Sequence, residues 1–523
     1  MSPTLSFSAI LRQTTGRDLS ADGVFEGLTD FGLFAEKMPP CFTSEGLSAH
    51  VNAALAKIET ESDSNELKKH FGKVIHSQIR YQSLRDINIP RHLAIPHPES
   101  YLAHCLAIKR CWQKIKTHCA KPSKPISRIF VRQTSENRVF KMNYKGLERF
   151  EVEEDEIGYQ TGATHLVKAD ISKCFPSIYT HSIPWAIHGK ANAKKNRNLL
   201  LEGNLLDRSC QILSDNQTNG LAIGPHSSNV ISEIILTRID ETLLKKGYTR
   251  LTRHIDDYSF YATSHQEAET FVRDLNLALR EYELYINEKK TQIVELPQPA
   301  SASWVSELNR FTFPDGEIRF SSVRSFLDLA LELSRQHGTS AVLNYAIKMV
   351  PNRLNNRAKR LFTAEATNLC LAYPYLAPIM EETVFVKHRN SETDDQIEVL
   401  GNELIKIGID KIHPDSIAHA LHFAIEHDFQ IDLTEDELKE IIQIDDCLSN
   451  VLLWEYAGLK SLTKVKKWLR TRANNLKGQE KPDQDAQWLL IYTIWTDGDL
   501  RGSGQAFLAD LKKNNFEFTK FSS

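Results

Sequence analysis

Two acidic motifs constrain this chain more than any other feature of its sequence. The first is residues 165–175, HLVKADISKCF, and the second is residues 251–261, LTRHIDDYSFY. In each motif a β-prone run meets aspartate, at Asp170 and at the pair Asp256 and Asp257. A strand end and a hairpin tip bring such carboxylates side by side, and close carboxylates repel one another unless a cation lies between them. The sequence therefore predicts a site built around shared cations.

The expected cation is Mg²⁺, with Mn²⁺ as a substitute. Mg²⁺ prefers oxygen ligands and keeps coordination positions for substrate phosphates. Two such ions about 4 Å apart stabilise the attacking and leaving oxygens of an in-line phosphoryl transfer. We therefore predict a nucleotidyl transferase whose catalytic, metal-binding carboxylates are Asp170, Asp256 and Asp257. Neighbours on a strand face opposite sides, so Asp256 is predicted as the primary ligand of the pair, and the Ile171 carbonyl as a further ligand.

Composition sets the class of protein. The chain of 523 residues is long enough for two to four domains, and its hydrophobic and charged fractions are those of ordinary globular proteins. Its eight cysteines include no CxxC pair, which favours a reducing compartment over a disulfide framework. No apolar run approaches the roughly 20 residues of a membrane span, and the first residues do not resemble a signal peptide. We therefore expect a cytoplasmic protein without a membrane partner.

Charge is sorted along the chain although the net charge is only −3. Residues 101–150 hold 12 Lys and Arg against 2 Glu, residues 381–450 hold 5 against 18 Asp and Glu, and residues 460–481 hold 8 against one Glu. Such asymmetry favours a local path for a polyanion, and we interpret the acidic block as solvated helix faces. The basic residues predicted to contact a triphosphate or a template are Arg128, Arg132, Arg138 and Lys141.

The order of expected elements is that of a polymerase palm. A strand leads into Asp170, helices are expected over residues 227–245 and 265–281, and a strand is expected near Tyr285. Another helix is expected over residues 101–119, before two prolines. We divide the chain into an N-terminal helical region (1–75), fingers (76–160), a palm (161–320) and an α-helical, repeat-like C-terminal domain (321–523).

Three residues around the acidic motifs are predicted to bind a nucleotide. Phe175 would lie beside the sugar and exclude a 2′-hydroxyl, unless it is simply a core residue. Gly224 lies in a glycine-containing loop, which can approach a base pair or phosphates closely. Lys290 would neutralise the triphosphate or protonate pyrophosphate, although a solvated turn explains it equally well.

A further basic cluster is expected after Pro351. Arg353, Arg357 and Arg360 fall at i, i+4 and i+7, so they would share one face of a helix. We predict that this face follows the phosphates of a nucleic acid, with a merely solvated face as the alternative.

Taken together and in this order, the motifs resemble those of reverse transcriptases. The stretch from Asp170 to Phe175 is similar to the first catalytic motif of that family, and residues 220–228 are similar to its template- and dNTP-contacting motif. Residues 254–258 are similar to its Asp-Asp motif, and residues 287–291 to its lysine motif. The sequence departs from the family by having His-Ile-Asp-Asp where many members have Tyr-x-Asp-Asp, which affects packing near the primer end and leaves the carboxylates in place.

A narrower resemblance is to the abortive-infection and other defence-associated reverse transcriptases of bacteria. It rests on residues 174–189 (CFPSIYTHSIPWAIHG), 91–101 and, more softly, 487–492. This resemblance implies a role in anti-phage defence, Mg²⁺-dependent synthesis of DNA from dNTPs, and homo-oligomers. It also implies either priming on a protein tyrosine, extension without an ordinary template, or copying of a companion noncoding RNA.

We therefore predict an α+β chain with the right-hand polymerase fold, fingers and palm, followed by an α-helical C-terminal domain. Its predicted activity is that of an RNA-directed DNA polymerase. Two alternatives remain open at this point: a template-independent terminal deoxynucleotidyl transferase, and an RNA-binding oligomeric scaffold with a vestigial palm. The intact set of three aspartates argues against the scaffold.

Overall fold

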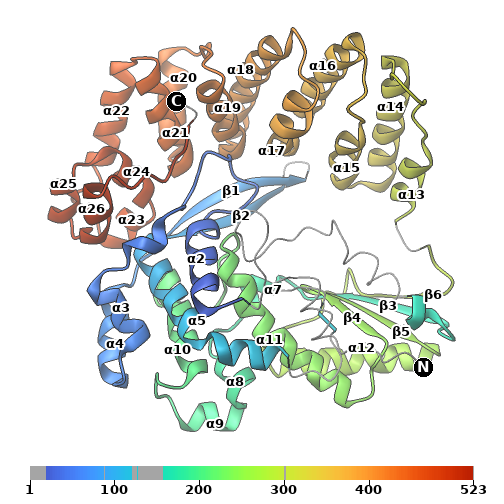
Figure 1. Ribbon diagram of the computed structural model, residues 1–523, viewed down its shortest axis with the longest axis vertical. Coiled ribbons are helices and arrows are strands. Elements are labelled where there is room, and N and C mark those ends of the chain that lie inside the picture. Colours follow the sequence, from blue (N-terminus) through green and yellow to red (C-terminus); the bar gives the residue numbers. More distant parts are fainter. Residues whose placement is uncertain (1–18, 87–88, 121–125, 128–156, 300–301, 522–523) are drawn as a thin grey trace. The chain divides into compact units, whose positions relative to one another are not determined.

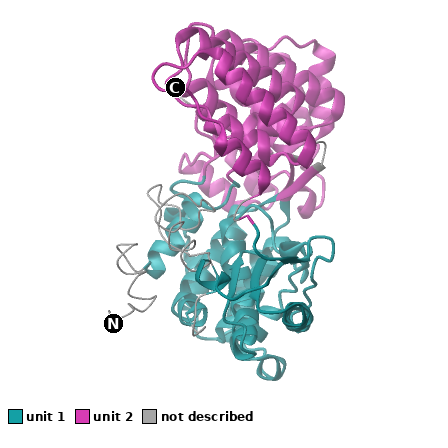
Figure 2. Ribbon diagram, turned by 90° about the vertical axis from the view of Figure 1, so that its right-hand side faces the viewer, with its two compact units in different colours: residues 1–35, 44–78, 94–298 teal, residues 36–43, 79–93, 299–523 magenta. Residues whose placement is uncertain are grey.

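The computed structural model describes residues 19–86, 89–120, 126–127, 157–299 and 302–521. The chain forms two compact units, and neither of them is a continuous stretch of sequence (Figure 2). The first unit consists of residues 1–35, 44–78 and 94–298, and the second of residues 36–43, 79–93 and 299–523.

The first unit combines helices with a four-stranded sheet (Figure 1). Its helices are α2 (Ala21–Phe31), η1 (Leu47–His50), α3 (Ala53–Thr60), α4 (Ser64–Lys73), α5 (Pro98–Cys119), α7 (Cys174–Ser177), α8 (Ser182–His188), α9 (Lys190–Lys195), α10 (Glu202–Gln211), η2 (Ile212–Ser214), α11 (His226–Lys245) and α12 (His265–Arg280). The longest of them, α5, begins with a proline in its first turn and is buried along most of its length. Its Tyr101 hydroxyl donates to the carbonyls of Leu28 (2.9 Å) and Gly32 (2.8 Å), which ties it to α2.

The sheet holds the two acidic motifs on neighbouring strands. Its strands are β3 (His165–Asp170), β4 (Leu251–His254), β5 (Asp257–Ala262) and β6 (Gln292–Glu295), in the order β4-β5-β3-β6, and every neighbouring pair is antiparallel. Side chains alternate between the two faces of a strand. Phe260 stacks on Phe271 of α12 with ring centroids 4.4 Å apart, whereas Tyr261 packs with Leu166 in a separate small core. Apolar contacts on both faces therefore fix the register.

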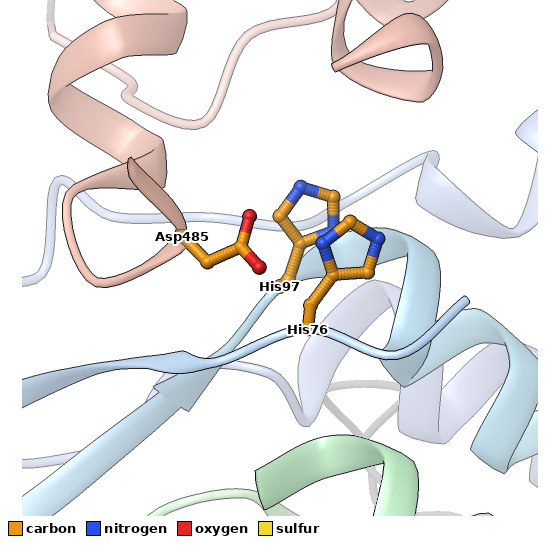
Figure 3. Close-up of side chains that lie close together, drawn as sticks. All are labelled: His76, His97 and Asp485. Carbon is orange, nitrogen blue, oxygen red and sulfur yellow. The ribbon is translucent and has the colours of Figure 1, made fainter. Parts of the chain in front are cut away.

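The two histidines that flank the start of the β-ribbon stack face to face. His76 and His97 have ring centroids 3.7 Å apart and an interplanar angle of 6° (Figure 3). His76 Nε2 also lies 2.9 Å from a carboxylate oxygen of Glu99, in the first turn of α5. These contacts join the segment before β1 to the start of α5.

The second unit is largely helical, with most of a two-stranded β-ribbon. The ribbon is formed by β1 (Gln78–Asp86) and β2 (Ile89–Pro96). The helices are α13 (Ser303–Arg310), α14 (Phe320–His337), α15 (Ala341–Met349), α16 (Asn356–Ala372), η3 (Pro374–Leu376), α17 (Ala377–Met380), η4 (Glu381–Val386), α18 (Thr393–Lys411), α19 (Pro414–Glu426), α20 (Glu435–Ile444), α21 (Cys447–Leu459), α22 (Thr463–Asn474), α23 (Lys481–Asp485), α24 (Trp488–Ile494), α25 (Asp497–Gly502) and α26 (Ala506–Lys513).

A buried acid joins the ribbon to this helical array. Asp415, in the first turn of α19, accepts from the Tyr81 hydroxyl (2.5 Å) and from the Leu84 amide (2.9 Å). Burial raises the pKa of Asp415 to about 6. Two segments that are more than three hundred residues apart in the sequence thus share one buried polar contact.

Most sequence-based expectations for single elements are confirmed. The helices expected over 101–119, 227–245 and 265–281 correspond to α5, α11 and α12, and helices dominate after residue 322. The strand expected near Tyr285 is wrong, because only Ile286 pairs there, in an isolated bridge with Ile171, and β6 follows the lysines instead of preceding them. In the described part of the chain, no helix is both long enough and apolar enough to cross a bilayer.

Candidate active site

The three aspartates of the acidic motifs lie at one end of the sheet. Asp170 is the last residue of β3, and in the register of the ladder it lies directly opposite Asp257, the first residue of β5. Asp256 lies in the turn between β4 and β5, and its carbonyl accepts from the Ile171 amide at 3.2 Å. The structure therefore brings together all four residues that the sequence predicted as metal ligands.

Electrostatics at this end of the sheet show that the carboxylates disfavour one another's charge. Burial, followed by repulsion from Asp257 and then from Asp170, raises the pKa of Asp256 to about 6. Burial and Asp170 raise the pKa of Asp257 as well. A divalent cation relieves such repulsion, so the donor set of Asp170, Asp256 and Asp257 fits hard, oxygen-liganded ions of the Mg²⁺ type.

A lysine already supplies one positive charge to this cluster. Lys290 Nζ lies 2.5 Å from Asp170 Oδ2, although the lysine side chain is largely exposed and the aspartate is buried. Asn287 fixes the same strand end, since its amide donates to the Asp170 carbonyl at 2.7 Å and its side chain donates to Asp170 Oδ2 at 3.4 Å. The sequence analysis included Asn287 in the lysine motif but predicted no role for it. Its membership of that motif was the available signal.

A buried guanidinium supports the hairpin that carries Asp256 and Asp257. Arg253 of β4 is fully buried and donates to both carboxylate oxygens of Glu233 (2.9 and 3.0 Å) and of Asp240 (2.7 and 3.0 Å), two acids of α11. The Tyr258 hydroxyl donates to Asp240 at 3.0 Å. Burial raises the pKa of Asp240, and the Arg253 charge opposes that shift. The network ties the strands on both sides of the turn to α11.

The same guanidinium holds the turn itself. Ile255 has φ 54°, which is rare for a β-branched residue, and its carbonyl accepts from Arg253 Nη1 at 2.9 Å. Sequence reasoning missed Arg253. The available signal was a charged residue in the middle of a strand-like run, where burial is tolerated only with paired acids.

Phe175 and the glycine loop meet in a second part of the site. Phe175, in the short helix α7 that follows Asp170, is partly exposed and does not belong to the buried core. Its carbonyl accepts from the Leu221 amide at 2.8 Å, which ties α7 to the loop before α11. Gly224 in that loop has φ +134°, and a Cβ there would lie 3.0 Å from the Ala94 carbonyl oxygen. Close backbone packing thus accounts for Gly224, whose contact with a dNTP remains a prediction.

The predicted basic residues form two groups, one outside the described residues and one before and within α16. Arg128, Arg132, Arg138 and Lys141 lie outside the described residues. The expected helix face after Pro351 is wrong for Arg353, because α16 begins only at Asn356, capped by Asn355, and Arg353 donates to the Gly316 carbonyl at 3.2 Å. Arg360 pairs with Glu392 at 3.1 Å. Arg357 and Arg360 are the two of the three that lie on α16, and both are exposed.

Comparisons with known proteins found one matching family. Residues 113–324 match the family described as reverse transcriptase (RNA-dependent DNA polymerase). Solved structures that resemble the chain include apo telomerase from Candida tropicalis, at 11% sequence identity over 80% of this chain and 68% of that chain, with a TM-score of 0.31. No curated protein matches the sequence.

The family match confirms the predicted fold class and the predicted kind of enzyme. The chain carries the reverse transcriptase domain of the right-hand polymerase fold, fingers and palm, followed by a helical C-terminal part. Such a domain is an RNA-directed DNA polymerase, a nucleotidyltransferase that uses dNTPs and a nucleic-acid template. Reverse transcriptase domains generally use divalent metal ions.

Proposed function

We propose that this chain extends DNA by adding dNTPs through two-metal phosphoryl transfer, with Asp170, Asp256 and Asp257 as the metal-binding carboxylates. The observation that carries the proposal is the register of the sheet, which sets Asp170 directly opposite Asp257 and beside Asp256. The raised pKa of Asp256 adds support, because burial and neighbouring carboxylates disfavour its charged form, as is common at functional sites.

Residues around that cluster have different roles in the proposed reaction. Asp170, Asp256 and Asp257 would hold the divalent ions, which would supply positive charge to the attacking and leaving oxygens. In this proposal Lys290, whose Nζ pairs with Asp170, binds the triphosphate and gives a proton to the departing pyrophosphate. The Arg253 network keeps the aspartate hairpin in one geometry, which an in-line displacement requires.

Sugar selection belongs to Phe175 in this proposal. Its ring is partly exposed, one short turn beyond Asp170, and the backbone around it is fixed by the loop of Leu221. A ring in that place contacts the sugar at C2′ and excludes a hydroxyl there by shape.

We further propose that the polymerase acts in anti-phage defence, as the resemblance of residues 174–189 implies. In this setting the chain copies a companion noncoding RNA, starts synthesis on a protein tyrosine, or extends DNA without an ordinary template. Homo-oligomers are part of the same proposal. Cells that express the wild-type chain should then resist phages, whereas cells that express Asp256→Asn should not. Equal plaque numbers on both strains and on cells that lack the gene would contradict the defence role and leave the proposed chemistry untouched.

The decisive experiment is a nucleotide-addition assay with purified protein, Mg²⁺ and single dNTPs, with and without a primer on an RNA template. Extension that follows the template sequence supports the proposal. Addition without primer or template would instead indicate a terminal transferase. Absence of any addition, in Mg²⁺ or Mn²⁺ and together with RNA binding, would indicate a scaffold with a vestigial palm.

A further inference from the structure

A cluster of partly exposed aromatic rings follows Phe175 in the first unit, and the proposed chemistry makes no use of it. Tyr179 meets His181 with ring centroids 4.9 Å apart at 82°, and it meets Trp185 at 5.8 Å and 66°. Lys190 Nζ lies 4.1 Å from the centroid of the Trp185 ring. All three rings are partly exposed, and Lys190 is exposed. We refer to Tyr179, His181, Trp185 and Lys190 as the aromatic platform.

The platform lies in a stretch of the palm that contains basic residues and no acidic ones. Between Asp170 and Glu202 the sequence has five Lys and Arg and no acidic residue at all. The cations of that stretch are Lys173, Lys190, Lys194, Lys195 and Arg197. Partly exposed rings beside a lysine, in a stretch of sequence without acidic residues, fit a polyanion whose units carry flat faces.

Polar contacts beneath the rings hold the platform in place. His181 Nδ1 lies 2.5 Å from Asp207 Oδ2, and Asp207 Oδ1 accepts from the Gln211 side chain at 2.7 Å. Hydrogen bonding to Asp207 raises the pKa of His181, and the protonated ring is then held by an ionic hydrogen bond to Asp207. Helix α8, which carries Trp185, packs against α9 and α10 (Figure 1).

A short ladder of backbone hydrogen bonds joins the platform to Phe175, the residue proposed to select the sugar. The Leu221 amide donates to the Phe175 carbonyl (2.8 Å), the Gly220 amide to the Ile178 carbonyl (2.8 Å), and the Thr180 amide to the Thr218 carbonyl (2.8 Å). Tyr179 is only four residues beyond Phe175, a reach of at most about 14 Å. Tyr179 therefore lies within the length of a few nucleotides from Phe175.

We infer that the aromatic platform binds single-stranded nucleic acid, with bases stacking on Tyr179 and Trp185 and backbone phosphates contacting Lys190. The inference deepens the proposed polymerase function and rests on it for the identity of the strand. Stacking reads no sequence, because every base has a π-face. The platform therefore guides a strand toward or away from the active site without choosing its sequence.

Binding is tested with fluorescein-labelled dT20 and rU20 by fluorescence anisotropy, on the full chain, without dNTPs and in EDTA. Trp185→Ala and Tyr179→Ala should each weaken binding roughly 5- to 100-fold, the effect of losing one stacked base. Trp185→Phe should retain most of the affinity. Lys190→Gln should lower the slope of log affinity against log salt by about 0.7, the share of one phosphate contact on a single strand.

The matched control is Trp304→Ala. Trp304 is also partly exposed and meets a second partly exposed ring, Tyr345, with ring centroids 5.7 Å apart at 79°, and it lies outside every basic stretch of the sequence. This control should bind within two-fold of wild type. Wild-type affinity in both Tyr179→Ala and Trp185→Ala would overturn the inference, as would an equal loss in the control. Preference for rU20 would assign the strand as template, and preference for dT20 as product.

Nucleotide addition is measured in parallel so that the two proposals fail separately. Asp256→Asn should bind dT20 and rU20 as wild type does and add no nucleotide. If the wild type adds nothing but Trp185 still governs binding, the polymerase proposal fails and the platform stands. If the wild type is active and the platform variants bind normally, only the platform fails.

Discussion

At the scale of single residues, Asp256 and Asp257 are neighbours with different surroundings. Asp257 lies opposite Asp170 in the ladder, whereas Asp256 occupies the turn and has its pKa raised to about 6. We predict that Asp256→Asn lowers kcat for dNTP addition at least about 100-fold, the usual cost of losing one charge-stabilising group. The melting temperature without metal should stay equal or rise, because the substitution removes repulsion. Wild-type incorporation by this variant would contradict the assignment.

In the proposal, Phe175 selects dNTPs over rNTPs. Because its side chain is partly exposed, it can be replaced without opening a cavity in the core. Because backbone hydrogen bonds hold its turn, Phe175→Ala should leave the fold intact. The ratio of kcat/KM for dATP over rATP should fall at least ten-fold, or about 1.4 kcal/mol, whereas Phe175→Tyr should keep the ratio near that of wild type. Equal loss with both nucleotides would show that Phe175 only packs, and a wild type without sugar preference would contradict the reverse transcriptase proposal.

At the scale of elements, the aspartate hairpin depends on α11. Arg253 is the single cation that pairs with both Glu233 and Asp240 in the described interior of the first unit. We predict that Arg253→Met lowers the free energy of unfolding by about 3–5 kcal/mol, because it leaves two buried acids without their partner. Chemical denaturation followed by circular dichroism measures this loss.

A triple variant separates the loss of charge pairing from the loss of shape. Arg253→Met combined with Glu233→Gln and Asp240→Asn removes the stranded charges, so most of the stability should return. Nucleotide addition should stay low in the triple variant, since nothing then holds the Ile255 carbonyl and its positive φ. Full activity in the triple variant would show that the network contributes only to stability.

At the scale of the whole molecule, each unit is assembled from segments far apart in the sequence. In the second unit, the buried Asp415 joins β1 to α19, and burial raises its pKa from about 3.9 in an unfolded chain to about 6. The folded state then binds more protons than the unfolded state between these values, so this group's contribution to stability falls as pH rises.

We predict that the difference in unfolding free energy between wild type and Asp415→Asn changes with pH. It should favour the wild type by about 1.4 kcal/mol more at pH 5 than at pH 7.5, because only the wild type titrates. Tyr81→Phe keeps the acid but removes a hydrogen bond that lowers the pKa of Asp415, so in this variant the pH-dependent loss of stability should move to higher pH. A difference that is independent of pH would mean that Asp415 is ionised throughout this range.

Local sequence determined the elements of the palm and the kind of chemistry. A β-prone run before Asp170, a second one around Asp256 and an intervening helical pattern suffice to predict β3, the β4–β5 hairpin and α11, because hydrophobic periodicity is a local property. The residue types at the strand ends were enough to predict a carboxylate site. The strand expected near Tyr285 failed because strand formation depends on a partner, and Ile286 finds only one bridge.

Only the tertiary structure decided the register and the partners. No local pattern specifies that Asp170 faces Asp257, that Lys290 reaches Asp170, or that Arg253 is buried between two acids of α11. Pairing register is chosen by which side chains become buried on both faces of the sheet, and burial is a property of the assembled fold. The same holds for Tyr81 and Asp415. They are far apart in the sequence, and only the packing of the second unit brings them into contact. The sequence alone therefore determined which groups the site contains, and the packing of distant segments determined which of them touch.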